Sequence, residues 1–232
     1  DDKGKEYLTF LNYRTNQILF YDLETTDFLF KLNLNSEGPH GVVQPTGLYV
    51  KDLNHIYVSS YVYSGLMRVD TTCHIIQKIP YGITSKGYNV LPSYTPSSHP
   101  YIAPVIIDKK IYITQNAIDR FHPIVDTPLS VVIDTVQKSC EDLPLTYGIL
   151  TEKELAIKDP RFSRVFNGKE FIYSFYVSED IVVTSVDHSE VKKISVKSKY
   201  LDSPIVKQEV SERGPQLNLE SVSYTHLTLP TI

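Results

Sequence analysis

Four times along the chain, an apolar run of strand-forming residues ends at an aspartate, passes through a tight turn and resumes as a second run. The aspartates are Asp22, Asp70, Asp134 and Asp187, at intervals of roughly 48, 64 and 53 residues. Short strands that recur with a period of roughly 40–50 residues are typical of propeller blades. The sequence therefore predicts an all-β fold, an incomplete β-propeller of about four four-stranded antiparallel blades.

Each of these aspartates occupies the same corner of its own blade, at the end of the third strand. An aspartate side chain can accept a hydrogen bond from the backbone two residues further along, and it can thereby start a turn. We therefore interpret the four carboxylates as turn-forming residues and not as a shared set of metal ligands.

The predicted blades lie near residues 6–34, 46–80, 101–144 and 162–197, within a single propeller fragment that spans residues 1–221. Their strands, lettered A to D from the inside outwards, are hairpin-linked runs of aromatic and branched residues between turn formers. The first blade lacks strand A, and a fifth blade is expected to start after residue 203. The predicted strands are 7–11, 18–22, 28–32, 47–50, 56–60, 66–70, 75–79, 102–107, 111–115, 129–134, 139–143, 163–166, 170–177, 181–187 and 191–196.

The sequence at each end of the chain indicates how that end arose. Residues 222–231 resemble a translated sequencing adapter, so we treat 222–232 as a non-native tail and exclude it from fold reasoning. Native sequence is then expected to end near Ser221. The first residues contain neither an initiator Met nor an apolar signal segment, as in a mature or clipped N-terminus.

Composition narrows the classes of protein. A hydrophobic content of 41% is enough for a packed core, and no apolar run is long enough to span a bilayer. A net charge of −4 with mixed signs argues against a nucleic-acid surface, which needs a basic stripe. The cysteines Cys73 and Cys140 are too few for a disulfide framework, and the sequence leaves open whether they pair with each other. It also leaves the oligomeric state open.

Loop lengths give the strongest indication of a binding face. In a propeller, the D–A and B–C connections emerge on one face and the A–B and C–D turns on the other. Here the long connections are 35–46, 80–101, 116–128 and 144–162, all on the D–A and B–C face, and binding residues concentrate on such loops. The candidate ligand-binding residues, each of which could also be an ordinary surface side chain, are His40, Tyr61, Tyr94, His99, Arg120, His122 and Arg161.

Recognised catalytic patterns are absent from the sequence. There is no zinc helix, phosphate loop, nucleophile elbow, calcium loop or metal-spaced Cys/His cluster. We therefore assign no catalytic residue, metal or cofactor, and predict a non-enzymatic binding protein for a peptide, glycan or partner protein. The alternative is a metal-dependent hydrolase or lyase, with His40, His99 and His122 meeting at the propeller axis. One short helix is predicted at 151–156, where Thr151 and Glu154 form a capping box.

Several segments together resemble an uncharacterised propeller lipoprotein family, a domain of unknown function found in gut Bacteroidota. They are residues 36–42, 46–50, 52–58, 162–168, 173–175 and 191–198, and the resemblance covers nearly all of the chain before residue 222. It implies a six-bladed propeller held behind a lipidated cysteine in the cell envelope, and therefore an envelope location. No catalytic residue carries over from it. Within residues 36–42, the Glu37–Gly38–Pro39–His40–Gly41 turn is interpreted as structural, because glycine permits positive φ and proline fixes the entry.

Overall fold

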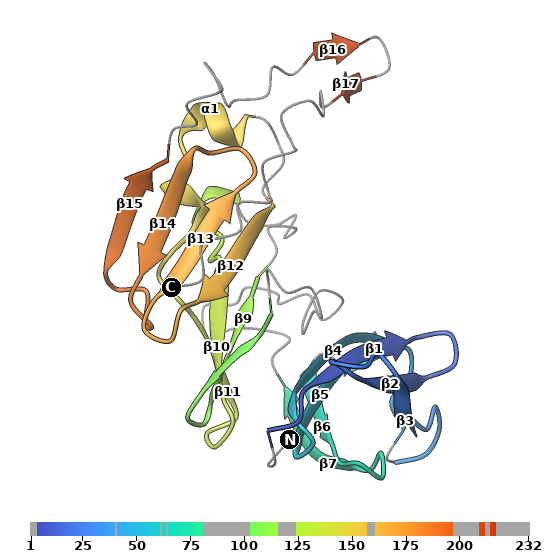
Figure 1. The fold of residues 1–232 in the computed structure, drawn as a ribbon. Coiled ribbons are helices and arrows are strands. Elements are labelled where there is room, and N and C mark those ends of the chain that lie inside the picture. The colour runs from blue at the N-terminus through green and yellow to red at the C-terminus, as the bar shows by residue number, and fades with distance from the viewer. Residues whose placement is uncertain are drawn as a thin grey trace. The chain divides into compact units, whose positions relative to one another are not determined.

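The computed structural model describes residues 4–39, 41–60, 62–63, 65–80, 103–115, 124–156 and 161–196, together with the backbone of 209–211 and 214–216 (Figure 1). Nearly all of its elements are strands. They are β1 (Tyr7–Asn12), β2 (Gln17–Asp22), β3 (Phe28–Asn33), β4 (Pro45–Asp52), β5 (His55–Ser60), β6 (Gly65–Val69), β7 (Ile75–Pro80), β8 (Val105–Ile107), β9 (Lys110–Thr114), β10 (Ser130–Asp134), β11 (Ser139–Asp142), β12 (Phe162–Phe166), β13 (Phe171–Phe175), β14 (Asp180–Thr184), β15 (Val191–Ser195), β16 (Glu209–Ser211) and β17 (Gly214–Gln216).

The strands form antiparallel meanders in which neighbours in sequence are also neighbours in the sheet. The first sheet contains β1–β3, the second β4–β7, the third β8–β11 and the fourth β12–β15, while β16 and β17 form a separate pair. None of these described sheets closes into a barrel. This open succession of small sheets, with three strands in the first and four in each of the next three, confirms the predicted fold class.

Alternation of side chains explains why the second sheet can lie between two others. The chain divides into two compact units, residues 1–146 and 147–232, and the first three sheets belong to the first unit. Ile56 and Val58 on β5 join a cluster with Ile18 and Phe20 of the first sheet. Tyr57, between them in sequence, points to the opposite side and joins a cluster with residues of the third sheet. Successive residues of a strand face opposite sides of its sheet, so both faces of the second sheet are buried.

The fourth sheet, in the second unit, has one well-packed face. Phe171, Tyr173 and Phe175 alternate along β13 and are all buried. Tyr147, in the 3-10 helix η3 (Tyr147–Ile149), is fully buried and makes edge-to-face contacts with Phe175 and with Phe162 of β12. Burying a phenylalanine side chain contributes about 1.5–3 kcal/mol, so this aromatic layer stabilises the unit. We call this side of the sheet its inward face.

All four aspartates stabilise turns, as the sequence predicted, but Asp187 lies within the β14–β15 turn and not at the end of its strand, because β14 ends at Thr184. The Oδ1 atom of Asp22 accepts hydrogen bonds from the backbone N–H groups of residues 24 and 25, and that of Asp70 from those of residues 72 and 74. Asp134 accepts from residues 136 and 137, and Asp187 from residue 189. The hydroxyls of Ser185 and Ser189 also donate to Asp187, and these bonds lower the pKa of Asp187 to about 2. The carboxylates are thus occupied by the turns that they stabilise.

Two other local expectations can be compared with the structure. The dipeptide Asn167–Gly168 is typical of the two central residues of a hairpin turn, but the backbone N–H of Asn167 donates to the carbonyl of Glu170, at 3.2 Å. The two central residues are therefore Gly168 and Lys169, one position later, and Gly168 takes the positive φ of +94°. Cys73 and Cys140 are both buried free thiols, which settles the alternative that the sequence left open.

Candidate functional site

The connections between strands differ in length in the way that the predicted binding face requires. The A–B turns span only 53–54, 108–109 and 167–170, whereas the D–A connections span 34–44, 81–104 and 143–161. The B–C connection is long only in the third sheet, at 115–129, and covers four residues in each of the other sheets. Alternate connections of an antiparallel meander lie at opposite ends, so within each sheet the long connections lie at one and the same end of that sheet. We call this end the long-loop face.

Most of the predicted ligand-binding residues lie outside the described part of the chain, so the structure neither brings them together nor separates them. These are His40, Tyr61, Tyr94, His99, Arg120 and His122. The alternative metal site built from His40, His99 and His122 is therefore not tested. Among the described residues, no group of three or more histidine, cysteine, aspartate or glutamate side chains is placed to hold a metal ion.

Arg161 is the one predicted site residue whose position is described. It is exposed just before β12, and its guanidinium lies 4.9 Å from the centre of the Tyr176 ring. The backbone N–H of Tyr176 also donates to the carbonyl of Arg161, at 3.2 Å. Tyr176 starts the β13–β14 connection, so the pair presents a cation and an aromatic ring together on the long-loop face.

A short helix in the 143–161 connection is held by the predicted capping box. In α1 (Glu152–Leu155), the Oγ1 atom of the N-cap residue Thr151 accepts a hydrogen bond from the backbone N–H of Glu154. The Glu154 carboxylate accepts one from the backbone N–H of Thr151, at 2.7 Å. These reciprocal bonds satisfy backbone donors that would otherwise be open at the start of the helix.

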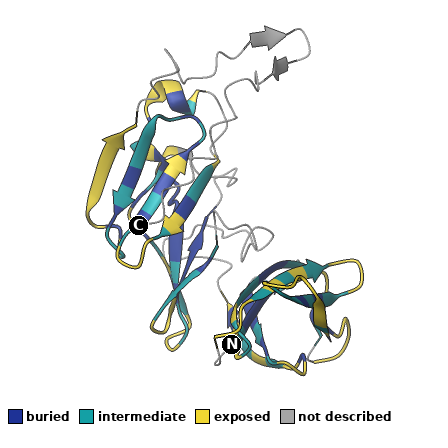
Figure 2. Cartoon of the chain, viewed as in Figure 1, coloured by how far each residue is buried: buried dark blue, intermediate teal, exposed yellow. Residues whose placement is uncertain are grey.

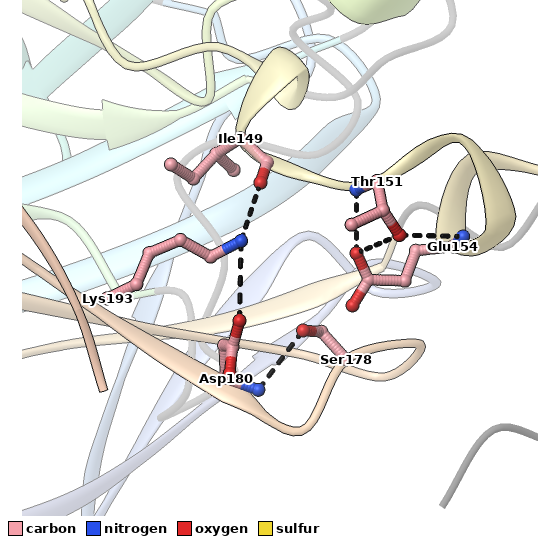
Figure 3. Close-up of polar contacts among 6 residues, drawn as sticks. All are labelled: Ile149, Thr151, Glu154, Ser178, Asp180 and Lys193. Atoms are coloured by element: carbon pink, nitrogen blue, oxygen red, sulfur yellow. Dashed lines mark hydrogen bonds and ion pairs between the residues drawn. The ribbon is translucent and has the colours of Figure 1, made fainter. Parts of the chain in front are cut away.

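The same connection is tied to the fourth sheet by polar contacts (Figure 3). The Nζ atom of Lys193 on β15 donates to the carbonyl of Ile149, at 2.9 Å, and forms an ion pair with Asp180 on β14, at 3.3 Å. Burial acts to raise the pKa of Glu154, but hydrogen bonds from Ser178 and Thr151 and the nearby charge of Lys193 outweigh it and lower that pKa. Glu154 therefore remains a carboxylate that joins α1 to the β13–β14 connection.

The turn before the second sheet shows why its glycines are needed. Gly38 has a φ of +83°, and its carbonyl accepts a hydrogen bond from the backbone N–H of Gly41, at 3.0 Å. A Cβ atom on Gly41 would lie 2.7–2.9 Å from backbone atoms of Glu37. The backbone N–H of Val42 then donates to the carbonyl of Asn35, at 2.7 Å, and closes the turn. These contacts agree with the structural interpretation of the motif.

We expect Gly41→Ala to lower the free energy of unfolding by about 1–3 kcal/mol, because backbone atoms of Glu37 must move to admit the new methyl group. Urea denaturation followed by circular dichroism measures this change. Ser36→Ala, at an exposed position of the same connection, serves as the control and should alter stability by less than about 0.5 kcal/mol. Equal stability of Gly41→Ala and the unmodified chain would contradict the tight turn.

A buried polar row inside the fourth sheet was missed by sequence reasoning. Arg164 on β12 is only 2% exposed, pairs in register with Tyr173 on β13, and is hydrogen-bonded to the Tyr173 hydroxyl. The Tyr173 hydroxyl also lies 2.5 Å from Nε2 of His188, which follows Asp187 in the β14–β15 turn and is 1% exposed. The only signal for this row in the sequence was the charged residue in β12, because its neighbours on the same face of the sheet are apolar or aromatic.

Hydrogen-bond partners assign the proton positions in this row. The Nδ1 atom of His188 lies 3.2 Å from the carbonyl of Val186, which can only accept, so Nδ1 carries the proton. Burial, with a smaller contribution from the charge of Arg164, lowers the pKa of His188 to about 4, so the ring is neutral at pH 7. Its Nε2 atom then accepts from the Tyr173 hydroxyl, whose oxygen accepts from Arg164. The row lies on the inward face and is a structural feature of the sheet.

Stacked antiparallel meanders with long connections at one end define a propeller-like all-β protein. The chain belongs to the family described as Domain of unknown function (DUF4221), whose model matches residues 1–227. Among curated proteins, none matches the sequence.

Two solved structures support the fold assignment. A member of the DUF4221 family from Bacteroides vulgatus is 20% identical, with a TM-score of 0.68 over 94% of this chain and 59% of that chain. A protein described as exported, from Bacteroides fragilis, is 11% identical, with a TM-score of 0.50 over 83% of this chain and 49% of that chain. The chain therefore spans about half to three fifths of the length of these relatives. At these identities the similarity concerns the fold alone.

Proposed function

We propose that this protein is a non-enzymatic binding protein of the bacterial cell envelope, which takes up a peptide, a glycan or a partner protein on its long-loop face. The observation that carries the proposal is the distribution of loop lengths over a rigid β-sheet frame. Loops that are longer than about a dozen residues and are held by such a frame are commonly functional.

The residues that the structure describes on this face support the proposal. Arg161 and Tyr176 offer a planar cation and an aromatic ring on adjacent connections, both residue types that are enriched at interaction hot spots. The capping box of α1 and the bonds of Lys193 hold the neighbouring 147–155 segment in place. A segment that is already ordered loses less conformational entropy when it binds a ligand.

The envelope location is supported by the description of the Bacteroides fragilis relative as an exported protein. No helix in the described part of the chain is long and apolar enough to cross a bilayer. The lipid anchor implied by the family resemblance can be tested on the full-length gene product, by labelling cells with a radioactive or clickable fatty acid.

A direct test begins with a screen of the protein against arrays of immobilised glycans and peptides, which identifies a probe that it binds. Arg161→Ala should weaken binding of whichever probe is retained by at least about fivefold, because it removes a solvent-facing cation worth about 1 kcal/mol at a hot spot. The triple variant His40→Ala, Tyr94→Ala and Arg120→Ala should weaken the same binding further. Isothermal titration calorimetry with the retained probe measures both effects.

The matched control is Lys109→Ala, which removes an exposed cation from the β8–β9 turn at the opposite end of the strands. This variant should bind as the unmodified chain does. Binding that survives both the Arg161 change and the triple change, or that is lost equally in Lys109→Ala, would contradict the assignment of the long-loop face.

A further inference from the structure

The carboxylate of Glu154 makes a contact that reaches beyond the helix it caps. Of its hydrogen bonds, the capping box of α1 requires only the one from the backbone N–H of Thr151, at 2.7 Å. The hydroxyl of Ser178, in the β13–β14 connection, donates to the same carboxylate. Glu154 is 8% exposed and is the buried residue of a short helix whose other residues reach solvent (Figure 2). A carboxylate is costly to bury unless hydrogen bonds compensate it, so this position indicates a role beyond the cap.

The hydroxyl of Ser178 fixes the shape of the β13–β14 connection. Its oxygen accepts a hydrogen bond from the backbone N–H of Asp180, at 3.1 Å, while its hydrogen is donated to Glu154. The backbone N–H of Ser178 donates to the carbonyl of Phe175, at 3.4 Å, which closes a β-turn. Tyr176 lies inside this turn. The direction in which its ring leaves the backbone therefore depends on how Ser178 is held.

A second contact ties the segment that contains η3 and α1 to the fourth sheet (Figure 3). The Nζ atom of Lys193 donates to the carbonyl of Ile149, at 2.9 Å, and pairs with the carboxylate of Asp180, at 3.3 Å. The segment from Ile149 to Glu154 is therefore held at both ends. The bond at Glu154 is the one that ends inside the turn of Tyr176.

We propose that Glu154 is the positioning residue of the Arg161–Tyr176 pair. Through its bond to Ser178, it fixes the turn that carries the Tyr176 ring, so that the ring and the guanidinium are stacked before a ligand arrives. The inference rests on the proposed function of the long-loop face and deepens it, since it names a buried residue that prepares this face without contacting the ligand. A pair that is already ordered loses less side-chain freedom on binding, so loss of this bond should weaken binding about three- to tenfold.

A fluorescent reporter tests the positioning without any ligand. The chain contains no tryptophan, so Tyr176→Trp introduces a single reporter at the pair, and the indole ring is the best partner for a stacked cation. In this background, Ser178→Ala removes the bond to Glu154 but leaves the capping box of α1 intact. We expect acrylamide to quench the reporter about twofold or more strongly, because the ring is no longer held against the guanidinium. Arg161→Ala, which removes the guanidinium itself, sets the size of the full effect.

Three further variants in the reporter chain separate positioning from a loss of stability. Ser178→Thr keeps a hydroxyl at the same position and should restore the original quenching. Ser174→Ala makes the matched chemical change at an exposed position of β13 and should leave the quenching unchanged. Tyr173→Phe destabilises the same sheet without touching the turn, so it should also leave the quenching unchanged.

Binding of the probe that the glycan or peptide arrays retain tests the consequence for function. In the chain with an unmodified Tyr176, Ser178→Ala should weaken this binding about three- to tenfold, and Ser178→Thr should not. Adding Glu154→Gln to Ser178→Ala should weaken it little further, because both changes break the same hydrogen bond. Isothermal titration calorimetry measures the three affinities.

Unchanged quenching in Ser178→Ala would overturn the inference, whether or not the arrays retain a probe. An equal rise in Tyr173→Phe would also overturn it, because the effect would then belong to the stability of the sheet. So would raised quenching in Ser178→Ala with unchanged affinity for a probe that Arg161→Ala weakens. If the arrays retain nothing, the proposed function fails, whereas raised quenching in Ser178→Ala and its restoration in Ser178→Thr still support Glu154 as the residue that positions the pair.

Discussion

Replacing Tyr173 by Phe should lower the free energy of unfolding of the fourth sheet by about 2–4 kcal/mol. The change removes a single oxygen, which accepts a hydrogen bond from the guanidinium of Arg164 and donates one to Nε2 of His188. Both partners are at least 98% buried, so water cannot replace the lost bonds. A buried polar group that loses a partner costs about 1–3 kcal/mol, and more when it is charged.

The measurement is urea denaturation combined with hydrogen exchange of the β12–β14 amides, which assigns the loss to this sheet. Tyr13→Phe removes a hydroxyl from a side chain that is 69% exposed and should change stability by less than about 0.5 kcal/mol. If Tyr173→Phe were as stable as Tyr13→Phe, the hydrogen-bonded row would not contribute to the stability of the sheet.

Acidification from pH 6.5 to about 4 should destabilise the fourth sheet. Burial lowers the pKa of His188 from its ordinary value of 6.5 to about 4 in the folded chain. The unfolded chain therefore binds a proton at a pH where the folded chain does not. The stabilising contribution is fully present above pH 6.5 and is lost as the pH falls towards 4. Since each pH unit corresponds to about 1.4 kcal/mol, the total loss is about 3 kcal/mol.

His188→Asn should remove this dependence, because asparagine does not titrate and tolerates the positive φ of +59° at this position. The variant should be less stable than the unmodified chain at pH 7 and should show little further loss between pH 6.5 and 4. His74→Asn, which replaces an exposed histidine, should retain the original slope. Urea midpoints measured at intervals of half a pH unit test both expectations, and an unchanged slope in His188→Asn would assign the loss to another group.

The pKa of Asp187 is lowered to about 2, so the folding stability that Asp187 contributes is lost in a lower pH range than that of His188. Its folded pKa lies below the ordinary value of 3.8, so the stability that it supplies is present above pH 3.8 and is lost only as the pH falls towards 2. The two contributions therefore separate on the pH axis, which allows the His188 effect to be measured without interference from the adjacent carboxylate.

The features that the sequence predicted correctly are those that depend on neighbours in the chain. Asp22 and Asp134 start turns because their side chains reach backbone N–H groups two and three residues away. Thr151 and Glu154 form their capping box within one turn of helix. The strands were predictable for the same reason, since alternation and turn residues are local signals.

The buried row required tertiary information. Arg164, Tyr173 and His188 belong to two strands and a turn, and only the pairing register brings them together. Arginine is seldom buried, so its residue type indicated a surface position. The partners of Arg161 were missed for a similar reason, because Tyr176 lies fifteen positions away and faces Arg161 only after β12 and β13 have paired.

The amino-acid order by itself determined which segments form strands, which aspartates turn the chain, and which end of each sheet carries the long connections. Each of these follows from backbone geometry and from hydrogen bonds between residues a few positions apart. Tertiary structure alone decided which polar side chains are buried together and which apolar faces remain open, because burial depends on what packs against a residue. The exposed Val165 and the fully buried Phe171 are both apolar strand residues in adjacent strands, and they differ only in the side of the sheet that they face.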